Sequence, residues 1–212
     1  KTLLGSDVQS TRTKLHEAIP ITGTITTGTY SDLNIKNYAH GMFQSVYDYP
    51  YLSSSANHIM DITLGYASSS NFSSSVATQN TQKIQIYNQM AQVLVGHDAT
   101  GSIRNFDEDG NLSSGAKLRE CYFVNFARLL TKDEIQKGTF SMTLGVDTTG
   151  NAGSNVTRQL VLTDASGTNG FKSNSPAGEY GILFVTASQT GVLGASMPNG
   201  GGLAAGLLYY QA

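Results

Sequence analysis

The stretch FSMTLGV at residues 140–146 decides how this sequence folds. Apolar residues alternate there with small or polar ones, and a period of two places the apolar side chains on one face of a β-strand. The same alternation returns at residues 156–163, and two more strand-like stretches follow at 180–185 and 203–210. Glycine-rich turns, which include Gly200-Gly201-Gly202, separate these stretches. We therefore predict an antiparallel sheet or sandwich in the C-terminal half.

The N-terminal half mixes helix and strand signals. The clearest helix covers residues 81–95, where apolar residues recur every three or four positions, and Gly96 is a natural stop. Residues rich in β-branched and aromatic side chains predict strands at 21–30 and 58–66. Residues 1–20 are predicted to form either an extended arm or a short helix.

The remaining segments predict loops and short elements. Residues 31–56 read as irregular and rich in tyrosine, and residues 68–75 read as an exposed loop. Residues 105–116 read as a turn region with an Asp-Gly pair that favours a tight hairpin, and residues 118–130 as a buried strand. Residues 131–138 begin with a capping box and predict a short helix that a glycine closes.

Together these patterns predict an α+β chain. The antiparallel sheet or sandwich lies in the C-terminal half, and the N-terminal half holds one longer helix, one short helix and long irregular loops. An arm or short helix at 1–20 precedes a single β-rich globular domain at 21–212. The final run LLYYQA at 207–212 is an apolar strand without a polar ending. We expect the natural chain to continue beyond it, or a partner to cover it.

Composition narrows the class of function. Only 13% of the 212 residues are charged, against about a quarter in typical globular domains. The 11 tyrosines and 8 phenylalanines, with no tryptophan, favour large buried interfaces, where charge is depleted and aromatic residues are enriched. The net charge of −2 and the scattered basic residues disfavour nucleic-acid binding. No apolar run reaches the roughly 18 residues that span a membrane. The single cysteine, Cys121, reads as a buried inert thiol.

One short constellation has the residue types of a hydrolase triad. Ser55, His58 and Asp61 lie close together in sequence. Alternation along a strand would place His58 on the face opposite to the other two, and the chain has no Gly-x-Ser-x-Gly elbow. We therefore predict no catalytic role for them.

The acidic segment Asp107, Asp109 and Asn111 resembles the start of a calcium loop. The sixth position is Leu112 instead of glycine and the twelfth is Leu118 instead of glutamate, so we interpret the segment as a solvated hairpin turn. The four histidines lack zinc-site spacing, and no glycine-rich nucleotide motif occurs. The sequence therefore predicts no enzyme, no cofactor and no metal site. One alternative stays open, a hydrolase that uses the carboxylates of Glu120, Asp133, Glu134 and Glu179.

The most distinctive stretch is the tyrosine-rich segment at residues 38–51. It is interpreted as an aromatic platform for sugars, as a partner interface, or as a loop packed on its own core. Two further segments are candidate contact surfaces. The N-terminal arm at 1–20 can become ordered on a neighbour, and the edge of the C-terminal strand can add to a neighbour's sheet. The predicted assembly interface consists of Tyr38, Phe43, Tyr47, Tyr49, Tyr51, Leu207, Leu208, Tyr209 and Tyr210.

Five stretches resemble a family of uncharacterised virion structural proteins from T4-like tailed phages, especially those of marine cyanobacteria. They are HEAIPITGT at 16–24, residues 41–58, YNQMAQVLVG at 87–96, residues 125–135 and SPAGEY at 175–180. The resemblance extends over most of the chain, and members of the family look longer than this sequence. It implies a particle subunit without catalytic residues, located in the virion after assembly in the host bacterial cytoplasm.

The resulting hypothesis is a structural component of the phage tail or baseplate. Its expected partners are other copies of itself and other virion proteins, with no nucleic acid and no membrane. Two alternatives remain: a neck or head decoration protein of the same particle, and a carbohydrate-binding module that uses Tyr47, Tyr49 and Tyr51 to bind a host glycan.

Overall fold

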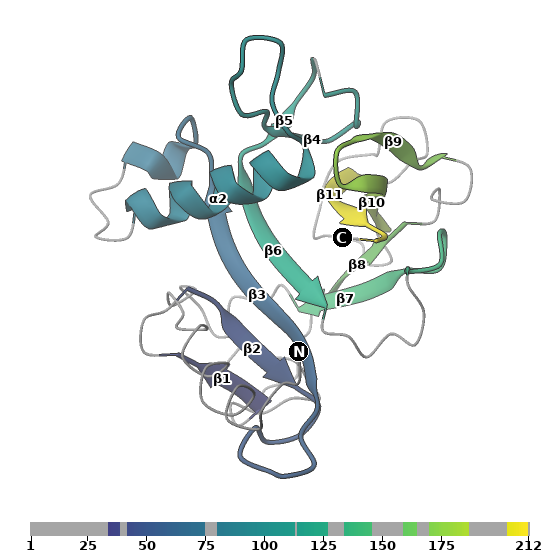
Figure 1. Cartoon of the computed structure of the whole chain (residues 1–212). Helices are drawn as coiled ribbons and strands as arrows, with labels where there is room; N and C mark the ends of the chain where they lie inside the picture. The colour runs from purple at the N-terminus through teal and green to yellow at the C-terminus, as the bar shows by residue number, and fades with distance from the viewer. Residues whose placement is uncertain are drawn as a thin grey trace, which may run out of the picture. The chain divides into compact units, whose positions relative to one another are not determined.

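A computed structural model describes the chain over residues 34–38, 42–74, 80–112, 114–126, 134–145, 159–164, 170–186 and 203–211 (Figure 1). Contacts group the described residues into two compact units. The first holds those up to Leu64 together with Tyr122–Phe126, and the second holds Gly65–Cys121 and those from Glu134 onward. The predicted arm at 1–20 and strand at 21–30 lie outside the described residues, and the single domain over 21–212 stays a prediction.

The first sheet has four strands in the order β1-β2-β3-β6. These are β1 (Ile35–Asn37), β2 (Gln44–Tyr47), β3 (His58–Tyr66) and β6 (Glu120–Phe126). Strand β2 pairs antiparallel with both β1 and β3. The strand predicted at 58–66 is confirmed. The irregular structure predicted for residues 31–56 is wrong where β1 and β2 form, because β2 buries the polar residues Gln44 and Ser45 and so lacks an apolar alternation.

Strand β6 is confirmed within the segment 118–130, but its predicted burial is wrong. Tyr122 is 61% exposed, and Asn125 is also exposed. Among the described strands β6 is the last in the order of its sheet, and one of its edges pairs with a described neighbour. An apolar strand at an edge has the same sequence pattern as one at the centre.

The second unit contains the antiparallel sheet predicted for the C-terminal half. Its strands are β7 (Ser141–Gly145), β8 (Gln159–Thr163), β9 (Lys172–Ser175), β10 (Gly178–Thr186) and β11 (Leu203–Tyr209). They follow the order β11-β10-β8-β7, with β9 paired to β10, and every pair is antiparallel. The predicted α+β class, with its C-terminal antiparallel sheet, is confirmed.

Most of the buried apolar residues of this sheet lie on one face, although Tyr180 is also fully buried. Four residues, one from each of β7, β8, β10 and β11, form a single row across it: Met142, Leu162, Val185 and Leu203. On the same face, Leu183, Leu208 and Tyr210 form a buried cluster against which Ile135 and Phe140 pack. A Cβ on Gly181 would lie 2.2 Å from the Tyr210 hydroxyl, so the residue facing that ring has to be glycine.

Helix α2 (Asn80–Leu94) is the helix predicted at 81–95. Its buried side carries Tyr87 and Ala91, and the Tyr87 hydroxyl donates to the Leu118 carbonyl at 2.7 Å and accepts the Phe106 N–H at 3.2 Å. Gly96 follows with φ 73°, and its N–H bonds the Ala91 carbonyl, so the predicted left-handed stop is confirmed. No helix in the described part of the chain is long and apolar enough to cross a bilayer.

Two predicted short segments differ from the structure. Among the described residues 134–140 there is a bend and a turn instead of a helix, and Gly138 closes that turn with φ 78°. The exposure predicted for the loop at 68–75 is confirmed at Ser68, Ser69, Asn71 and Phe72, but the segment also holds a 3-10 helix (Asn71–Ser74). Ser70 is buried there because its hydroxyl donates to the Glu120 carboxylate. A polar sequence does not reveal a buried hydrogen bond of this kind.

The turn predicted at 105–116 joins β4 (Phe106–Asp107) to β5 (Lys117–Leu118), but it is longer than the tight hairpin predicted and its first acidic residue is not solvated. Asp107 is fully buried, accepts the N–H groups of Asp109 and Gly110, and pairs with the Lys117 ammonium. The Lys117 side chain supplies the positive charge for this carboxylate. No group of metal-binding side chains occurs among the described residues.

A second fully buried carboxylate, Asp164, joins three parts of the C-terminal unit. It accepts the N–H groups of Gly138 and Phe140, each at 2.8 Å, and the Tyr210 hydroxyl at 3.1 Å. These three donors connect the end of β8 to the segment that precedes β7 and to the end of β11. The Tyr210 hydroxyl is buried, so it would be left without an acceptor if Asp164 were removed, whereas Gly138 and Phe140 are only partly buried.

Asp164→Ala is therefore expected to lower the free energy of unfolding by about 3 kcal/mol, because one buried and two partly buried donors lose their acceptor. Tyr210→Phe removes only one of the three bonds and is expected to cost about 1 kcal/mol. Urea denaturation followed by tyrosine fluorescence measures both values. Equal effects of the two substitutions would contradict a carboxylate that serves all three donors.

Lys83 lies on the buried side of α2 and is 6% exposed. Its ammonium has no hydrogen-bond partner among the described residues, and burial lowers the pKa of this amine. A buried unpaired charge destabilises the folded state. Since the folded pKa is lower than the unfolded one, the unfolded chain binds more protons, and stability rises with pH as the pH approaches 10.5.

We expect Lys83→Met to raise the free energy of unfolding at pH 7 by about 1–3 kcal/mol. The gain over the unmodified chain should shrink as the pH rises towards 10.5, because the unmodified lysine loses its proton. Thermal unfolding at pH 7 and pH 10 measures both effects. The matched control Lys117→Met should destabilise instead, because it leaves the buried Asp107 carboxylate without its cation.

Candidate functional site

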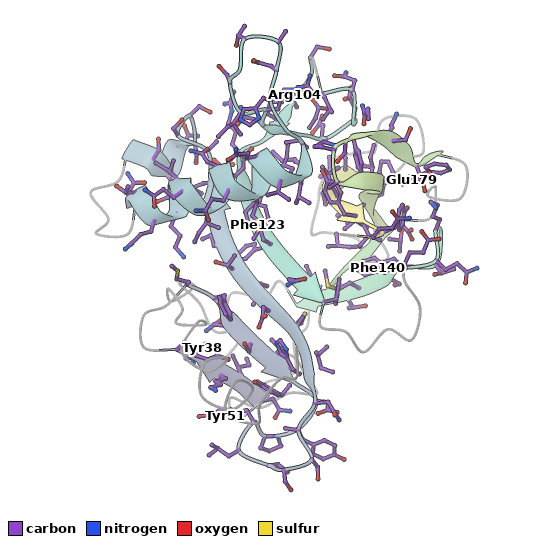
Figure 2. The ribbon with its side chains drawn as sticks, in the orientation of Figure 1. Tyr38, Tyr51, Arg104, Phe123, Phe140 and Glu179 are labelled. Carbon is purple, nitrogen blue, oxygen red and sulfur yellow. The ribbon has the colours of Figure 1, made fainter. Side chains whose placement is uncertain are left out.

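The tyrosine-rich residues of the first unit surround the β1-β2-β3 part of its sheet (Figure 2). The rings of Tyr38 and Phe43 lie with centroids 5.5 Å apart. The ring of Tyr47 contacts Tyr51, at 6.4 Å between centroids, and His58, at 5.3 Å. The structure therefore brings the predicted aromatic residues into two ring clusters. Tyr49 differs from them in being 58% exposed.

A chain of polar contacts runs beneath these rings. The hydroxyls of Tyr38 and Ser45 lie 3.1 Å apart, and Ser45 donates to Asp61 Oδ1 at 2.5 Å. The same oxygen lies 2.7 Å from His58 Nε2. Ser45 is 2% exposed, whereas His58 and Asp61 keep about a third and a fifth of their side-chain surface exposed. The polar contacts tie β2 to β3 beside the aromatic rings.

The contact between His58 and Asp61 corrects the prediction that they face opposite sides. Tyr47 pairs with His58, and Val46 pairs with Met60, so that Ile59 is an extra residue in β3. Such a bulge shifts the alternation by one position and turns His58 to the side of Asp61. A regular strand would have kept the two side chains apart.

These contacts do not form a nucleophile–base pair. In a serine hydrolase the histidine nitrogen accepts the serine proton, and the carboxylate holds the other side of the ring. Here the Ser45 hydroxyl donates directly to Asp61 Oδ1, and the same oxygen forms a hydrogen bond with His58 Nε2. Ser55 lies in the exposed turn before β3, where its N–H bonds Ser53 Oγ. The cluster is therefore organised as a structural link between strands.

Burial controls the ionisation of the groups near these surfaces. Burial, with the nearby Tyr38 and Asp61, raises the pKa of Tyr47 to about 12, so its hydroxyl stays protonated at neutral pH. In the second unit, burial and the nearby Glu120 raise the pKa of the Cys121 thiol to about 12. A thiol with so high a pKa is a poor nucleophile.

The carboxylates of the hydrolase alternative have separate roles in the second unit. Glu120 accepts the Ser70 hydroxyl, while Glu179 pairs with Lys137 at 2.7 Å. Glu134 accepts the Gln211 amide at 2.9 Å. The hydrogen bond that the Lys137 ammonium donates to Glu179 raises the pKa of Lys137 most, and the charge of Glu134 also raises it. Asp133 lies outside the described residues.

The predicted C-terminal contact residues pack largely within their own sheet. Leu208 and Tyr210 are 6% and 2% exposed, and Leu207 is half-buried. The Tyr209 ring stacks on Tyr180 with centroids 5.1 Å apart. Among the described strands β11 is the end strand of its sheet, so a partner could pair with its backbone edge. The role of these residues in an interface stays a prediction.

Sequence reasoning missed two exposed apolar residues beside the tyrosines. Leu52 is 83% exposed and Met42 is 52% exposed. The position of Leu52 between Pro50 and a run of three serines was the available signal, because apolar residues inside a turn cannot all turn inward.

Comparisons with family models, curated proteins and solved structures identified no match to this chain.

A double-mutant cycle tests the link between β2 and β3. Asp61→Ala should cost about 1–2 kcal/mol of unfolding free energy, because the buried Ser45 hydroxyl loses its acceptor. The coupling between Asp61→Ala and His58→Ala should be about 0.5–1 kcal/mol, since this pair is partly exposed. Urea denaturation at pH 7 measures the unfolding free energies of the unmodified chain, the two single variants and the double variant. A coupling of zero would be incompatible with the contact that the bulge creates.

Proposed function

We propose that this chain is a structural component of a tailed-bacteriophage virion, in the tail or baseplate, that acts through protein–protein contacts. The observation that carries the proposal is an apolar, weakly charged surface. Met42, Tyr49 and Leu52 are all more than half exposed within eleven residues, in a chain with only 13% charged residues. Met42 precedes β2, whereas Tyr49 and Leu52 lie in the loop after it, so both ends of this strand expose apolar side chains. Single exposed apolar residues are common, but low charge together with exposed aromatic and aliphatic side chains suits protein–protein contacts.

Further exposed apolar residues are distributed over both units. They are Phe72, Val93, Ile103, Tyr122, Leu144, Phe171 and Leu203. A subunit that is covered on several sides by neighbours gains from such a surface, because buried charges would have to be desolvated and paired. The resemblance to virion structural proteins of T4-like phages supports the same proposal from the sequence. A neck or head decoration protein would use the same contacts.

The second candidate function is attachment to a host glycan. The exposed ring of Tyr49 favours it, since aromatic rings can pack against the apolar face of a sugar. The neighbouring Tyr47 is less suited to that role, because its ring already contacts Tyr51 and His58. A glycan array with the unmodified chain and a Tyr49→Ala variant tests this candidate.

The proposal is tested by density-gradient sedimentation of the native source, followed by peptide mass spectrometry of each fraction. We expect peptides of this chain to sediment with a megadalton particle, at a constant ratio to capsid and tail proteins. A high-salt wash separates adsorbed protein from built-in subunits. Peptides found only among small free species would refute the virion role, whereas images of labelled particles would distinguish tail, baseplate, neck and head.

A further inference from the structure

The loop that joins β2 to β3, from Asp48 to Asn57, has a closed base. Here it is named the hairpin loop. The N–H of Asp48 donates to the Asn57 carbonyl at 3.1 Å. In return, the Asn57 N–H and side-chain amide donate to the two oxygens of the Asp48 carboxylate, at 2.6 and 2.9 Å. These Asn57 hydrogen bonds lower the pKa of Asp48, so the carboxylate stays ionised and bonded at neutral pH.

Two successive turns order the rest of the hairpin loop. The Ser53 N–H donates to the Pro50 carbonyl at 2.8 Å, and the Ala56 N–H donates to the Ser53 carbonyl at 3.1 Å. Below them, the Tyr51 ring rests on Tyr47. A ten-residue loop with this many internal bonds has little conformational freedom left to lose on binding.

The hairpin loop exposes two large apolar side chains together with three uncharged serines, Ser53, Ser54 and Ser55. Leu52 is 83% exposed and Tyr49 is 58% exposed. No charged residue occurs between Tyr49 and Asn57. The Asp48 carboxylate at the base of the loop accepts hydrogen bonds from Asn57 on both of its oxygens. An exposed leucine on an ordered loop gains free energy when a partner removes it from water, without a desolvated charge to oppose it.

From this geometry we propose that the hairpin loop is a preformed plug, whose Leu52 and Tyr49 side chains enter an apolar, uncharged pocket on another protein subunit of the same particle. The inference rests on the proposed virion function and names the contact through which it acts. The ordered loop sets the position of both side chains before the partner arrives. Leu52 is the anchor, and Tyr49 covers the rim of the pocket.

A protein pocket fits this loop better than a membrane or a sugar. Binding to a bilayer surface needs a larger apolar face or basic residues that attract anionic lipids, and the hairpin loop contains no lysine or arginine. Sugar binding favours an exposed aromatic face, whereas the most exposed large side chain is the aliphatic Leu52. Tyrosine is one of the residue types that contribute most to binding at protein interfaces, and an exposed leucine adds apolar area that a protein pocket can bury.

The test compares particles made from phage genomes that encode the unmodified chain, Leu52→Asp or Leu52→Met. The aspartate would place a charge in the pocket, so its copy number per particle should fall at least about tenfold, which corresponds to 1.4 kcal/mol. Leu52→Met conserves volume and polarity and should remain within about twofold of the unmodified chain. Purified chains with Leu52→Asp and Leu52→Met should unfold at the same temperature, since residue 52 is exposed in the free subunit.

The outcomes separate the plug from the virion function. Equal incorporation of Leu52→Asp and the unmodified chain would overturn the plug and leave the virion function standing. Absence of the unmodified chain from washed particles would overturn both. Binding of the purified chain to phosphatidylcholine vesicles or to an arrayed glycan, lost in Leu52→Asp while particle incorporation persists, would replace the protein pocket with that ligand.

Discussion

The extra residue in β3 opposite β2 is the constraint on which the first unit depends. Because Val46 pairs with Met60 and Tyr47 with His58, Ile59 bulges out of the ladder. A bulge increases the local twist and changes the direction of the chain at the point where it occurs. Here that point is the base of the hairpin loop, so the same residue brings His58 to Asp61 and sets the direction in which the loop leaves the sheet.

Few charges occur in this protein, yet several of them are inside it. Asp107 and Asp164 are fully buried, and each collects backbone N–H groups from segments without regular pairing. A carboxylate can accept several hydrogen bonds, so one buried group replaces the strand or helix partners that those segments lack. Irregular segments thereby become fixed without a large apolar core, which fits a chain that places many apolar residues on its surface.

Periodicity predicted the elements whose two sides differ in polarity. The helix at 80–94 and the strands at 58–66 and 141–145 follow directly from it, since burial of one side repeats in the sequence. It failed for β2, where Gln44 and Ser45 are buried as hydrogen-bonded polar groups. Neither the bulge at Ile59 nor the edge position of β6 changes the residue pattern, because both arise from pairing between distant segments. The tyrosines of the site were predictable as a group, whereas the exposure of Leu52 depended on the path of the loop.

The hairpin loop and β11 would bind partners by different forces. The hairpin loop would bind through its side chains, so its affinity for a partner would depend on the apolar area that the contact buries and on how well one pocket fits them. Towards its C-terminal end, β11 buries Leu208, and its edge would bind through backbone hydrogen bonds that accept many sequences. Neither surface depends on exposed ion pairs, and contacts of both kinds are weakly screened by salt. The hairpin loop would select the position of the subunit, and the β11 edge would then strengthen its binding. Once the first contact has formed, the second forms at a high effective concentration and so adds affinity.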